Sequence, residues 1–264
     1  MKFVLVTGAF GGMGKSVISE LANAGYTVLA LDKTVGEREQ NVIPITADLT
    51  DKESIEKAFI TVKSYTDKLY AILHFAGVYT LDSLVEMDEE KFTNAFNINL
   101  FGAFRVNKTF LPMLDSNSRI IITTSELAPL EPLPFTGIYA ITKSALDKYA
   151  YALRMEVQLL GIKVSVLRPG AVNTGMLGNS TAQLDKFCQN TKIYSCNAKR
   201  FKSIVERVET RNIPAEKIAK KTLKILKAKK PKQVYKINRN PLLLILNALP
   251  KRFQTFIIKK ILQK

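Results

Sequence analysis

The chain has 264 residues, of which 47% are hydrophobic, and a formal net charge of +16. This length can bury a sizeable core and suits a single α/β domain. No segment reaches the roughly 20 apolar residues that a membrane-spanning helix needs. The two cysteines, Cys188 and Cys196, lack the spacing of a metal or redox site, so we predict no metal site and a reducing compartment.

The charge is unevenly distributed. Residues 1–185 hold 17 Lys and Arg against 20 Asp and Glu, whereas residues 186–264 hold 22 against 3. A strongly basic C-terminal third predicts contact with an anionic surface, although a solvated face that only aids solubility would look the same. Between the two anionic partners, a membrane is favoured over a nucleic acid, because this region lacks interleaved aromatic residues and a recognisable nucleic-acid-binding module.

The N-terminus predicts a strand, a glycine-rich turn and a helix. Lys2–Thr7 is a β-branched run that leads directly into glycines, which indicates a buried strand rather than a signal peptide, and we expect a cytoplasmic protein. Lys15–Ala24 has apolar residues at helical spacing. Glycines at a helix N-terminus let backbone N–H groups approach a phosphate, so the turn is a candidate pyrophosphate site. Its glycines are Gly8, Gly11, Gly12 and Gly14.

The next predicted strand, Tyr26–Leu31, ends in Asp32. A carboxylate at this point can accept hydrogen bonds from the ribose hydroxyls of a dinucleotide and would repel a 2′-phosphate, so it favours NAD over NADP. Lys33 directly after it weakens that preference, and Asp32 could instead only cap a turn.

Strands and helices alternate through the middle of the chain. Val42–Ala47 and Leu69–Phe75 are predicted strands, with a helix over residues 52–62 between them. This spacing is typical of βαβ units, so we predict a single Rossmann-type, doubly wound α/β domain with a seven-stranded parallel sheet and helices on both faces. His74, the sole histidine, is predicted to be a hydrogen-bonded core residue rather than a catalytic one.

Two segments after the fourth strand carry polar residues in unusual places. Asn97–Leu114 reads as a buried helix but includes Asn97 and Asn99, whose amides need partners. Arg119–Thr124 is predicted as the fifth strand. Ser125 then lies at the carboxyl edge of the sheet, where open α/β sheets bind ligands.

Tyr139 and Lys143 stand at positions i and i+4 of the next predicted helix, which runs to about Leu160. Their side chains share one face of that helix, so the ammonium could favour the phenolate. A phenol whose pKa is drawn toward the working pH could take a proton from an alcohol. The spacing alone has little specificity, and most such pairs lie on protein surfaces.

The remaining core elements are a sixth strand over Ile162–Leu167, a helix over residues 214–230 and a seventh strand over Lys232–Ile237. We expect Ile218, Thr222, Ile225 and Leu226 to be the inward residues of that helix. The segment between the sixth strand and the helix, residues 176–212, is polar and poorly periodic, which suits a disordered surface loop.

The last residues, 241–264, are unlike a core element. Pro250 divides them into an apolar octet, Leu242–Leu249, and a second helix whose apolar residues share one face. This is the pattern of a helix that lies in a membrane interface, although a helix that packs across a dimer or over a substrate cleft would share it. The apolar face holds Phe253, Phe256, Ile257 and Ile261, and its basic rim holds Lys251, Arg252, Lys259, Lys260 and Lys264.

In their order along residues 2–175, these motifs resemble the short-chain dehydrogenase/reductase family. The resemblance implies a domain over residues 1–240, with residues 241–264 as an extension. It implies a catalytic tetrad of Asn99, Ser125, Tyr139 and Lys143, of which the last two also bind the cofactor. The other cofactor-binding residues that it implies are Gly8, Gly12, Met13 and Gly14 for the pyrophosphate, Asp32 for the ribose, Asp48 and Leu49 for the adenine, Ala76 and Gly77 for the cofactor wall, and Pro169, Gly170 and Thr174 for the nicotinamide carboxamide.

Two positions depart from the family pattern. Phe75 stands where the family usually has an asparagine, which questions the polar anchoring of that strand end. Ser125 lies 14 residues before Tyr139, one more than the family spacing, so we expect the connecting loop to bulge at its prolines. Thr124 is the alternative to Ser125 if the register differs.

The resemblance implies an NAD(H)-dependent oxidoreductase that interconverts a secondary alcohol and a ketone, and a homo-oligomer. It also implies that residues 176–212 close over the substrate. The tail and this insertion favour a bulky apolar substrate such as a hydroxysteroid, with a retinoid or a small 3-hydroxy acid as alternatives. The apolar residues of the insertion that we expect to contact substrate are Met176, Leu177, Phe187, Tyr194 and Phe201.

The tail also leads us to expect peripheral contact of residues 241–264 with the inner face of a membrane. The rival hypothesis is a membrane-associated regulator that binds NAD without catalysis. The complete tetrad argues against that hypothesis.

Overall fold

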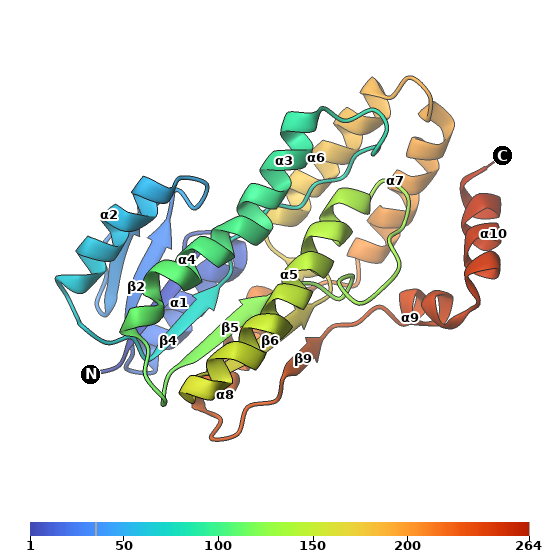
Figure 1. The fold of residues 1–264 in the computed structure, drawn as a ribbon. Helices are drawn as coiled ribbons and strands as arrows, with labels where there is room; N and C mark the ends of the chain where they lie inside the picture. Colours follow the sequence, from blue (N-terminus) through green and yellow to red (C-terminus); the bar gives the residue numbers. More distant parts are fainter. Residues whose placement is uncertain (35, 264) are drawn as a thin grey trace.

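A parallel sheet forms the centre of the protein, as Figure 1 shows for the computed structural model. The structure describes residues 1–34 and 36–263, apart from the side chains of residues 175–181 and Glu209. Within them the strands follow the order β3-β2-β1-β4-β5-β6-β9, all parallel, which confirms the predicted seven-stranded doubly wound sheet. The strands are β1 (Phe3–Thr7), β2 (Thr27–Asp32), β3 (Val42–Thr46), β4 (Ala71–His74), β5 (Arg119–Thr123), β6 (Lys163–Pro169) and β9 (Val234–Ile237).

The direction of winding reverses between β1 and β4. From β1 the chain proceeds outward through β2 to β3, then returns to β4 on the other side of β1 and proceeds outward again. At such a reversal, the loops that follow the two central strands diverge and open a crevice at the carboxyl edge of the sheet. A separate two-stranded sheet pairs β7 (Val172–Asn173), which follows β6, with β8 (Ile213–Pro214), which directly precedes the helix that begins at Ala215.

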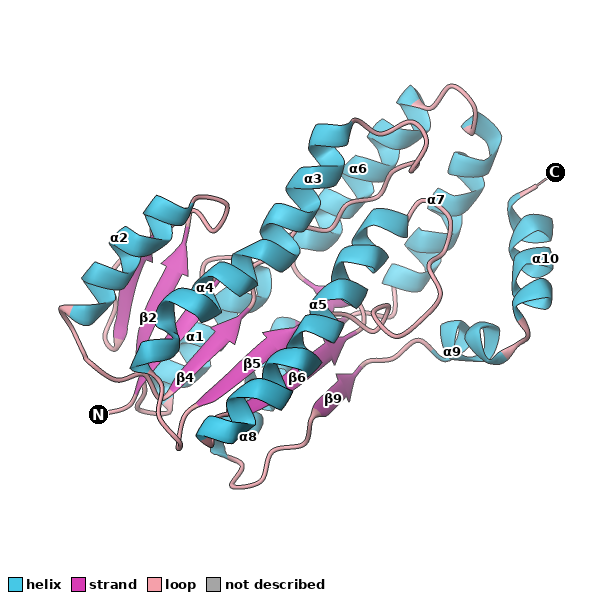
Figure 2. Ribbon diagram, in the orientation of Figure 1, coloured by secondary structure: helices cyan, strands magenta, loops and turns pink. Residues whose placement is uncertain are grey.

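Helices cover both faces of the sheet (Figures 1 and 2). On one face, α1 (Gly12–Asn23) and α8 (Ala215–Lys227) lie side by side. The other face is covered by α2 (Lys52–Lys63), α4 (Gly102–Phe110) and α5 (Gly137–Val157). Both faces of every central strand are therefore buried, which explains why the strands read as continuous apolar runs.

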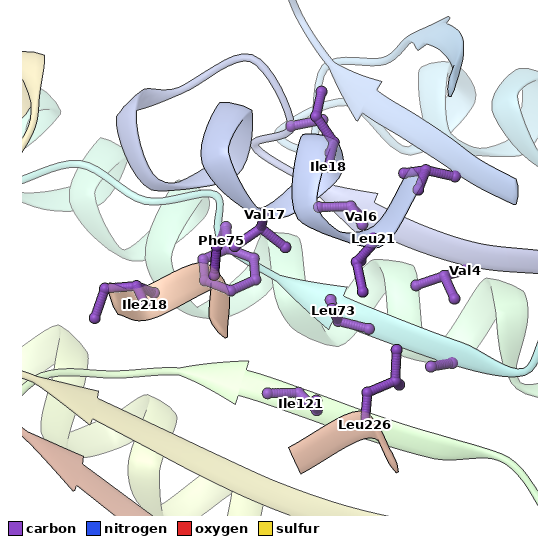
Figure 3. Packing of buried hydrophobic residues seen from close by; sticks show 14 of the residues in the cluster. Val4, Val6, Val17, Ile18, Leu21, Leu73, Phe75, Ile121, Ile218 and Leu226 are labelled. Atoms are coloured by element: carbon purple, nitrogen blue, oxygen red, sulfur yellow. The ribbon is translucent and has the colours of Figure 1, made fainter. Parts of the chain in front are cut away.

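Figure 3 shows the core beneath α1 and α8. Side chains alternate along a strand, so Val4 and Val6 of β1 pack with these two helices, whereas Leu5 packs with α2 and α4. Burying each such side chain away from water stabilises the folded state by about 1.5–3 kcal/mol. The predicted inward face of α8 is confirmed, because Ile218, Thr222, Ile225 and Leu226 are all buried.

The helix predicted to begin at Asn97 begins earlier. α3 (Glu89–Phe96) continues through a π-helical turn, Asn97–Phe101, into α4, and a 3-10 turn follows to Met113. α3 gives little periodic signal because Ala95 is its one buried residue.

Residues 176–212 are mostly helical, so the alternative of a disordered surface loop is wrong. α6 (Gly175–Asn190) and α7 (Ser195–Glu209) pack against each other. Leu184 and Phe187 of α6 are buried three residues apart, as are Ala198 and Phe201 of α7, so each pair shares one helix face. With the loops before α3 and α5 and the end of the chain, they form an aromatic cluster of Leu81, Phe135, Leu184, Phe187, Ala198, Phe201 and Leu262, with Tyr194 packed against it.

The C-terminal extension forms two helices, α9 (Pro241–Ala248) and α10 (Lys251–Leu262), divided at Pro250 as predicted. α10 packs against α7 through one face only, with Ile258 and Leu262 in the aromatic cluster. Its other face is open to solvent, where Phe253 is 61% and Phe256 57% exposed. Among the described residues, no helix has the length and apolar character to cross a bilayer.

Candidate functional site

The glycine turn brings three segments of backbone into contact. Gly8 has a φ of 65°, and a Cβ there would lie 2.5 Å from the backbone nitrogen of Ala76. A Cβ on Gly14 would lie 2.0 Å from the carbonyl oxygen of Gly8, and one on Gly12 would meet the side chain of Thr174 at 2.4 Å. A side chain at any of these positions would force β1, α1, and the segments after β4 and β6 apart.

The N-terminus of α1 suits an anionic group. The first N–H groups of a helix have no partner within it, and the helix dipole favours negative charge there. The first turn of α1 holds no acidic residue, and Gly11 and Gly12 are exposed. The residues of this turn, with Met13 beside the cavity described below, therefore fit the pyrophosphate of a dinucleotide.

Asp32 lies next to this turn at the end of β2. Its carboxylate accepts hydrogen bonds from the backbone N–H groups of Phe10, at 2.9 Å, and Thr34, at 3.0 Å. The carboxylate therefore both caps a turn and faces the glycine segment, where a nucleotide ribose would bind. Lys33 is exposed beside it.

Asp48 and Leu49 follow β3 on the same side. The carboxylate of Asp48 accepts hydrogen bonds from the hydroxyl, at 2.7 Å, and the N–H, at 2.8 Å, of Thr50, and these bonds lower the pKa of Asp48. Leu49 packs against Gly102 and accepts a hydrogen bond from Arg105 at its carbonyl oxygen, 3.1 Å. These contacts hold both residues in place after β3.

Asn99 anchors the segment after β4. Its Oδ1 accepts from the N–H of Val78 at 2.8 Å, and its Nδ2 donates to the carbonyl of Val78 at 3.0 Å and to Oγ1 of Thr142 at 2.9 Å. The π-helical turn places this buried amide among those partners. Phe75, where the family has an asparagine, is buried in the core instead. The polar anchoring of this strand end is therefore supplied by Asn99.

The ammonium of Lys143 is buried beneath the same segment. It donates to the carbonyl of Thr123 at 3.4 Å. A Cβ on Gly77 would lie 3.1 Å from this ammonium and 3.1 Å from Oδ1 of Asn99, so Gly77 leaves space between the two groups. Burial lowers the pKa of Lys143 to about 8, because the charged form is penalised away from water.

Tyr139 lies one turn before Lys143, and its ring centroid is 5.8 Å from the ammonium. Burial raises the pKa of Tyr139 to about 12, its hydrogen bond with Ser125 opposes this effect, and the charge of Glu126 adds to it. The expectation that Lys143 draws the pKa of the phenol downward is therefore corrected, because burial raises the pKa and the opposing effect comes from Ser125.

Ser125 rather than Thr124 is the hydroxyl beside the phenol. Ser125 bonds to Tyr139, whereas Oγ1 of Thr124 donates to the carboxylate of Asp147 at 3.3 Å. The loop before α5 accommodates the extra residue between Ser125 and Tyr139, and Phe135 in this loop has a φ of 64°. Such a conformation is unusual for a bulky residue. The ring of Phe135 is held in the aromatic cluster.

These side chains surround a cavity of about 200 Å³. Its inner end is formed by Ser125, Tyr139 and Lys143, together with Gly77, Pro169, Gly170 and Thr174. Its outer wall is apolar and comes from α7 and α9, with Phe201, Ile204, Val205, Val208 and Leu243. Phe201 is thus the expected substrate contact that lines the cavity, whereas Phe187 and Tyr194 support it from the aromatic cluster. The side chains of Met176 and Leu177 lie outside the described residues.

His74 takes no part in this site. Its Nε2 is 2.9 Å from Oδ1 of Asn107 inside the core, and burial lowers its pKa to about 4. The prediction of a core imidazole is confirmed. Among the described residues, there is no group of three metal-binding side chains.

Sequence reasoning missed several residues of the site. Tyr79 packs its ring edge-on to Tyr139, with centroids 4.5 Å apart. Thr142 orients Asn99, while Glu126 and Leu243 line the cavity. Thr142 and Glu126 adjoin predicted residues in the chain, which was an available signal. Tyr79 and Leu243 depend on tertiary packing and had none.

Comparison with known proteins agrees with this geometry. A family model described as short chain dehydrogenase matches residues 2–185. The 3-ketodihydrosphingosine reductase of Bacteroides thetaiotaomicron is 27% identical over 231 residues, which cover 87% of this chain and 85% of that protein. Human 17-beta-hydroxysteroid dehydrogenase type 6 is 30% identical over 202 residues, which cover 72% of this chain and 63% of that protein.

Among solved structures, an alcohol dehydrogenase from the archaeon Thermococcus sibiricus, complexed with 5-hydroxy-NADP, matches with a TM-score of 0.74. It is 23% identical, and the match covers 91% of this chain and 99% of that one. That likeness concerns the fold. The family match extends over more than half of the chain and includes the glycine turn, Ser125, Tyr139 and Lys143, so this protein belongs to the short-chain dehydrogenase family.

Proposed function

We propose that this chain is an NAD(H)-dependent oxidoreductase that interconverts a secondary alcohol and a ketone on a bulky apolar substrate. Its family consists of oxidoreductases that bind a nicotinamide cofactor. The observation that carries the proposal is the meeting of Tyr139, Ser125 and Lys143 at the inner end of a cavity with an apolar outer wall.

Each residue has a distinct role in this proposal. The nicotinamide, when bound, supplies or accepts the hydride. Tyr139 gives its phenolic proton to the ketone oxygen in reduction and takes it back in oxidation. Ser125, already bonded to the phenol, donates to the same oxygen and steadies the charge that develops on it. Asn99 is a positioning residue, because its side chain is occupied by Val78 and Thr142.

The cavity wall supports an apolar substrate. The side chains that α7 and α9 contribute to it are Phe201, Ile204, Val205, Val208 and Leu243, none of which offers a hydrogen bond. The names of the two relatives include a hydroxysteroid and a ketodihydrosphingosine, both largely apolar molecules with a secondary alcohol or ketone. We favour such substrates over sugars and short hydroxy acids.

Exposed apolar side chains on and beside α4 and α5 support a homo-oligomer. Phe101, in the π-helical turn before α4, is 43% exposed, and Phe104 on α4 is 44% exposed. Tyr151 and Met155 on α5 are 57% and 48% exposed. These two helices are adjacent on one face of the sheet (Figure 1). A second copy of the chain would cover this apolar area.

The C-terminal extension supports contact with a membrane surface. On its outer side, Leu242, Ile245, Phe253, Phe256 and Ile261 are each more than half exposed. Lys251, Arg252, Lys259 and Lys260 are exposed around them. An apolar face with a basic rim suits the boundary between anionic headgroups and acyl chains. α9 also contributes Leu243 to the cavity, so an apolar substrate would leave the membrane close to the site.

Tyr139→Phe is expected to lower turnover at least 100-fold, because the variant keeps the ring but loses the proton that catalysis moves. The assay is NAD(H)-linked turnover over a panel of steroids, retinol, 3-hydroxy acids and sugars, with NADH binding followed by fluorescence. NADH should still bind. Tyr149→Phe on the same helix is the matched control and should retain turnover, since the hydroxyl of Tyr149 accepts a hydrogen bond from Asn107 and lies outside the cavity wall that the described residues form. Unchanged turnover in Tyr139→Phe would refute the role, and NADH binding without turnover of any substrate by the wild type would favour the regulator.

Lys143→Met is expected to lose turnover and to unfold at higher urea concentration than the wild type near neutral pH. The pKa of Lys143 is lowered to about 8 in the folded protein and is near 10.5 in the unfolded chain. The unfolded chain therefore binds more protons between these values, and the wild type gains stability as pH rises from 8 to 10.5. The advantage of the variant should be roughly 3 kcal/mol below pH 8 and should shrink across that window. Parallel stability curves would contradict a buried ammonium.

Asp32→Ala is expected to raise kcat/KM for NADPH relative to NADH by at least tenfold, because the carboxylate that would repel a 2′-phosphate is gone. Lys33→Ala is the opposing control, since it removes a cation that could attract that phosphate, and it should deepen the preference for NADH. Steady-state kinetics with both cofactors measures the two ratios. A wild type that prefers NADPH would overturn the cofactor assignment.

Replacing Phe253 and Phe256 by Ser is expected to reduce co-sedimentation with phosphatidylserine-containing vesicles at least tenfold, because each phenyl ring contributes about 1.5–3 kcal/mol when buried. The control replaces Leu159 and Leu160, 84% and 58% exposed on another part of the surface, by Ser. Binding should fall with added salt and should be weaker on phosphatidylcholine alone. Retention on oligonucleotides without retention on vesicles would identify nucleic acid as the anionic partner instead.

A further inference from the structure

Glu126 is an acidic residue in the wall of the cavity that holds Ser125 and Tyr139. It directly follows Ser125, and among the described residues it and Lys143 are the only charged side chains in the cavity wall. The loop that carries it is fixed, because the backbone N–H of Glu126 donates to the carbonyl of Pro169 at 2.8 Å. The carboxyl group thus has a defined place beside the reacting end of the cavity.

One oxygen of this carboxyl group has a partner. Oε2 accepts from the backbone N–H of Asn240 at 2.6 Å, which ties the start of α9 to the catalytic loop. No hydrogen bond or ion pair among the described residues is made to Oε1, which lies 2.8 Å from the position that a Cβ on Gly170 would take. Gly170 itself lines the cavity.

The charge of Glu126 reaches the reacting groups, since it raises the pKa of Tyr139. Burial raises the pKa of Glu126 itself, while the N–H of Asn240 and the charge of Arg239 oppose that rise. A substrate that fills the cavity would remove the remaining water around this carboxyl group. Desolvating a carboxylate oxygen that has no hydrogen-bond partner is unfavourable, and a cation beside it offsets that cost.

Building on the proposed function, we propose that Glu126 binds an ammonium group of the substrate, and that the substrate is a long-chain amino alcohol or amino ketone with its nitrogen on the carbon next to the reacting carbon. Ser125 holds the reacting oxygen, and the residue after it holds the neighbouring nitrogen. The apolar wall of α7 and α9 receives the chain. A substrate carboxylate at the same place would face Glu126 and be repelled, which disfavours 3-hydroxy acids.

The test compares NAD-linked oxidation of 2-aminododecan-3-ol and dodecan-3-ol, two alcohols that differ only in the ammonium group. The wild type should show a kcat/KM at least tenfold higher for the amino alcohol. Glu126→Gln should lose this preference, mainly through KM for the amino alcohol, so that its kcat/KM values for the two alcohols become about equal. Glu131→Gln, which alters a carboxylate outside the cavity wall, is the matched control and should keep the preference.

Glutamine keeps the size of the side chain and an acceptor for the N–H of Asn240. The variant therefore removes the charge of Glu126 without removing the hydrogen bond that holds α9. An equal loss on both alcohols in Glu126→Gln would mean that Glu126 only fastens α9, and would overturn the inference. Equal kcat/KM for both alcohols in the wild type would also overturn it while leaving the alcohol dehydrogenase function intact. Turnover of neither alcohol, with steroids oxidised normally, would reject the amino alcohol class, whereas turnover of no alcohol at all would reject the function itself.

Discussion

The burial of the Lys143 ammonium is the constraint on which the site depends. A cation away from water is unstable unless polar groups surround it, and this one has the carbonyl of Thr123 at 3.4 Å and the amide of Asn99 across the gap left by Gly77. To reach those positions the chain needs a glycine after β4, a π-helical turn in the long helix and a carbonyl at the end of β5. The segment after β4, the π-helical turn and the end of β5 are therefore all arranged around the charge of Lys143.

Burial also sets the pKa values of the two side chains, Tyr139 and Lys143. Desolvation holds the phenol of Tyr139 protonated, with a pKa of about 12, and leaves Lys143 with a pKa of about 8. The protein by itself thus presents a proton donor at neutral pH, which matches ketone reduction. Alcohol oxidation requires further positive charge near the phenol, and a bound oxidised nicotinamide is the cationic group that the glycine turn is suited to hold.

Much of the fold could be predicted because its signals are local. The strands are short apolar runs between turn residues, and Gly8, Gly12 and Gly14 mark the turn through steric needs that few other residues meet. Tyr139 and Lys143 could be paired because helical spacing fixes their shared face. The helices α6 and α7 could not be predicted, because their apolar residues are buried only by packing with Phe135 and Leu262, which are distant in the chain. The direction of the Tyr139 pKa was likewise hidden, since burial is a property of the assembled fold.

The hydrogen bond between Glu126 and Asn240 joins residues 114 positions apart in the chain, whereas the hydrogen bond between Phe10 and Asp32 joins residues 22 positions apart. Contacts between distant residues form late in folding and are released early, because closing a long loop costs more entropy than closing a short one. The substrate half of the crevice, which includes Glu126, therefore opens more readily than the nucleotide half, which includes Asp32. In a partly unfolded protein, the half that selects the substrate would exchange its amide hydrogens first, while the nucleotide half stayed protected.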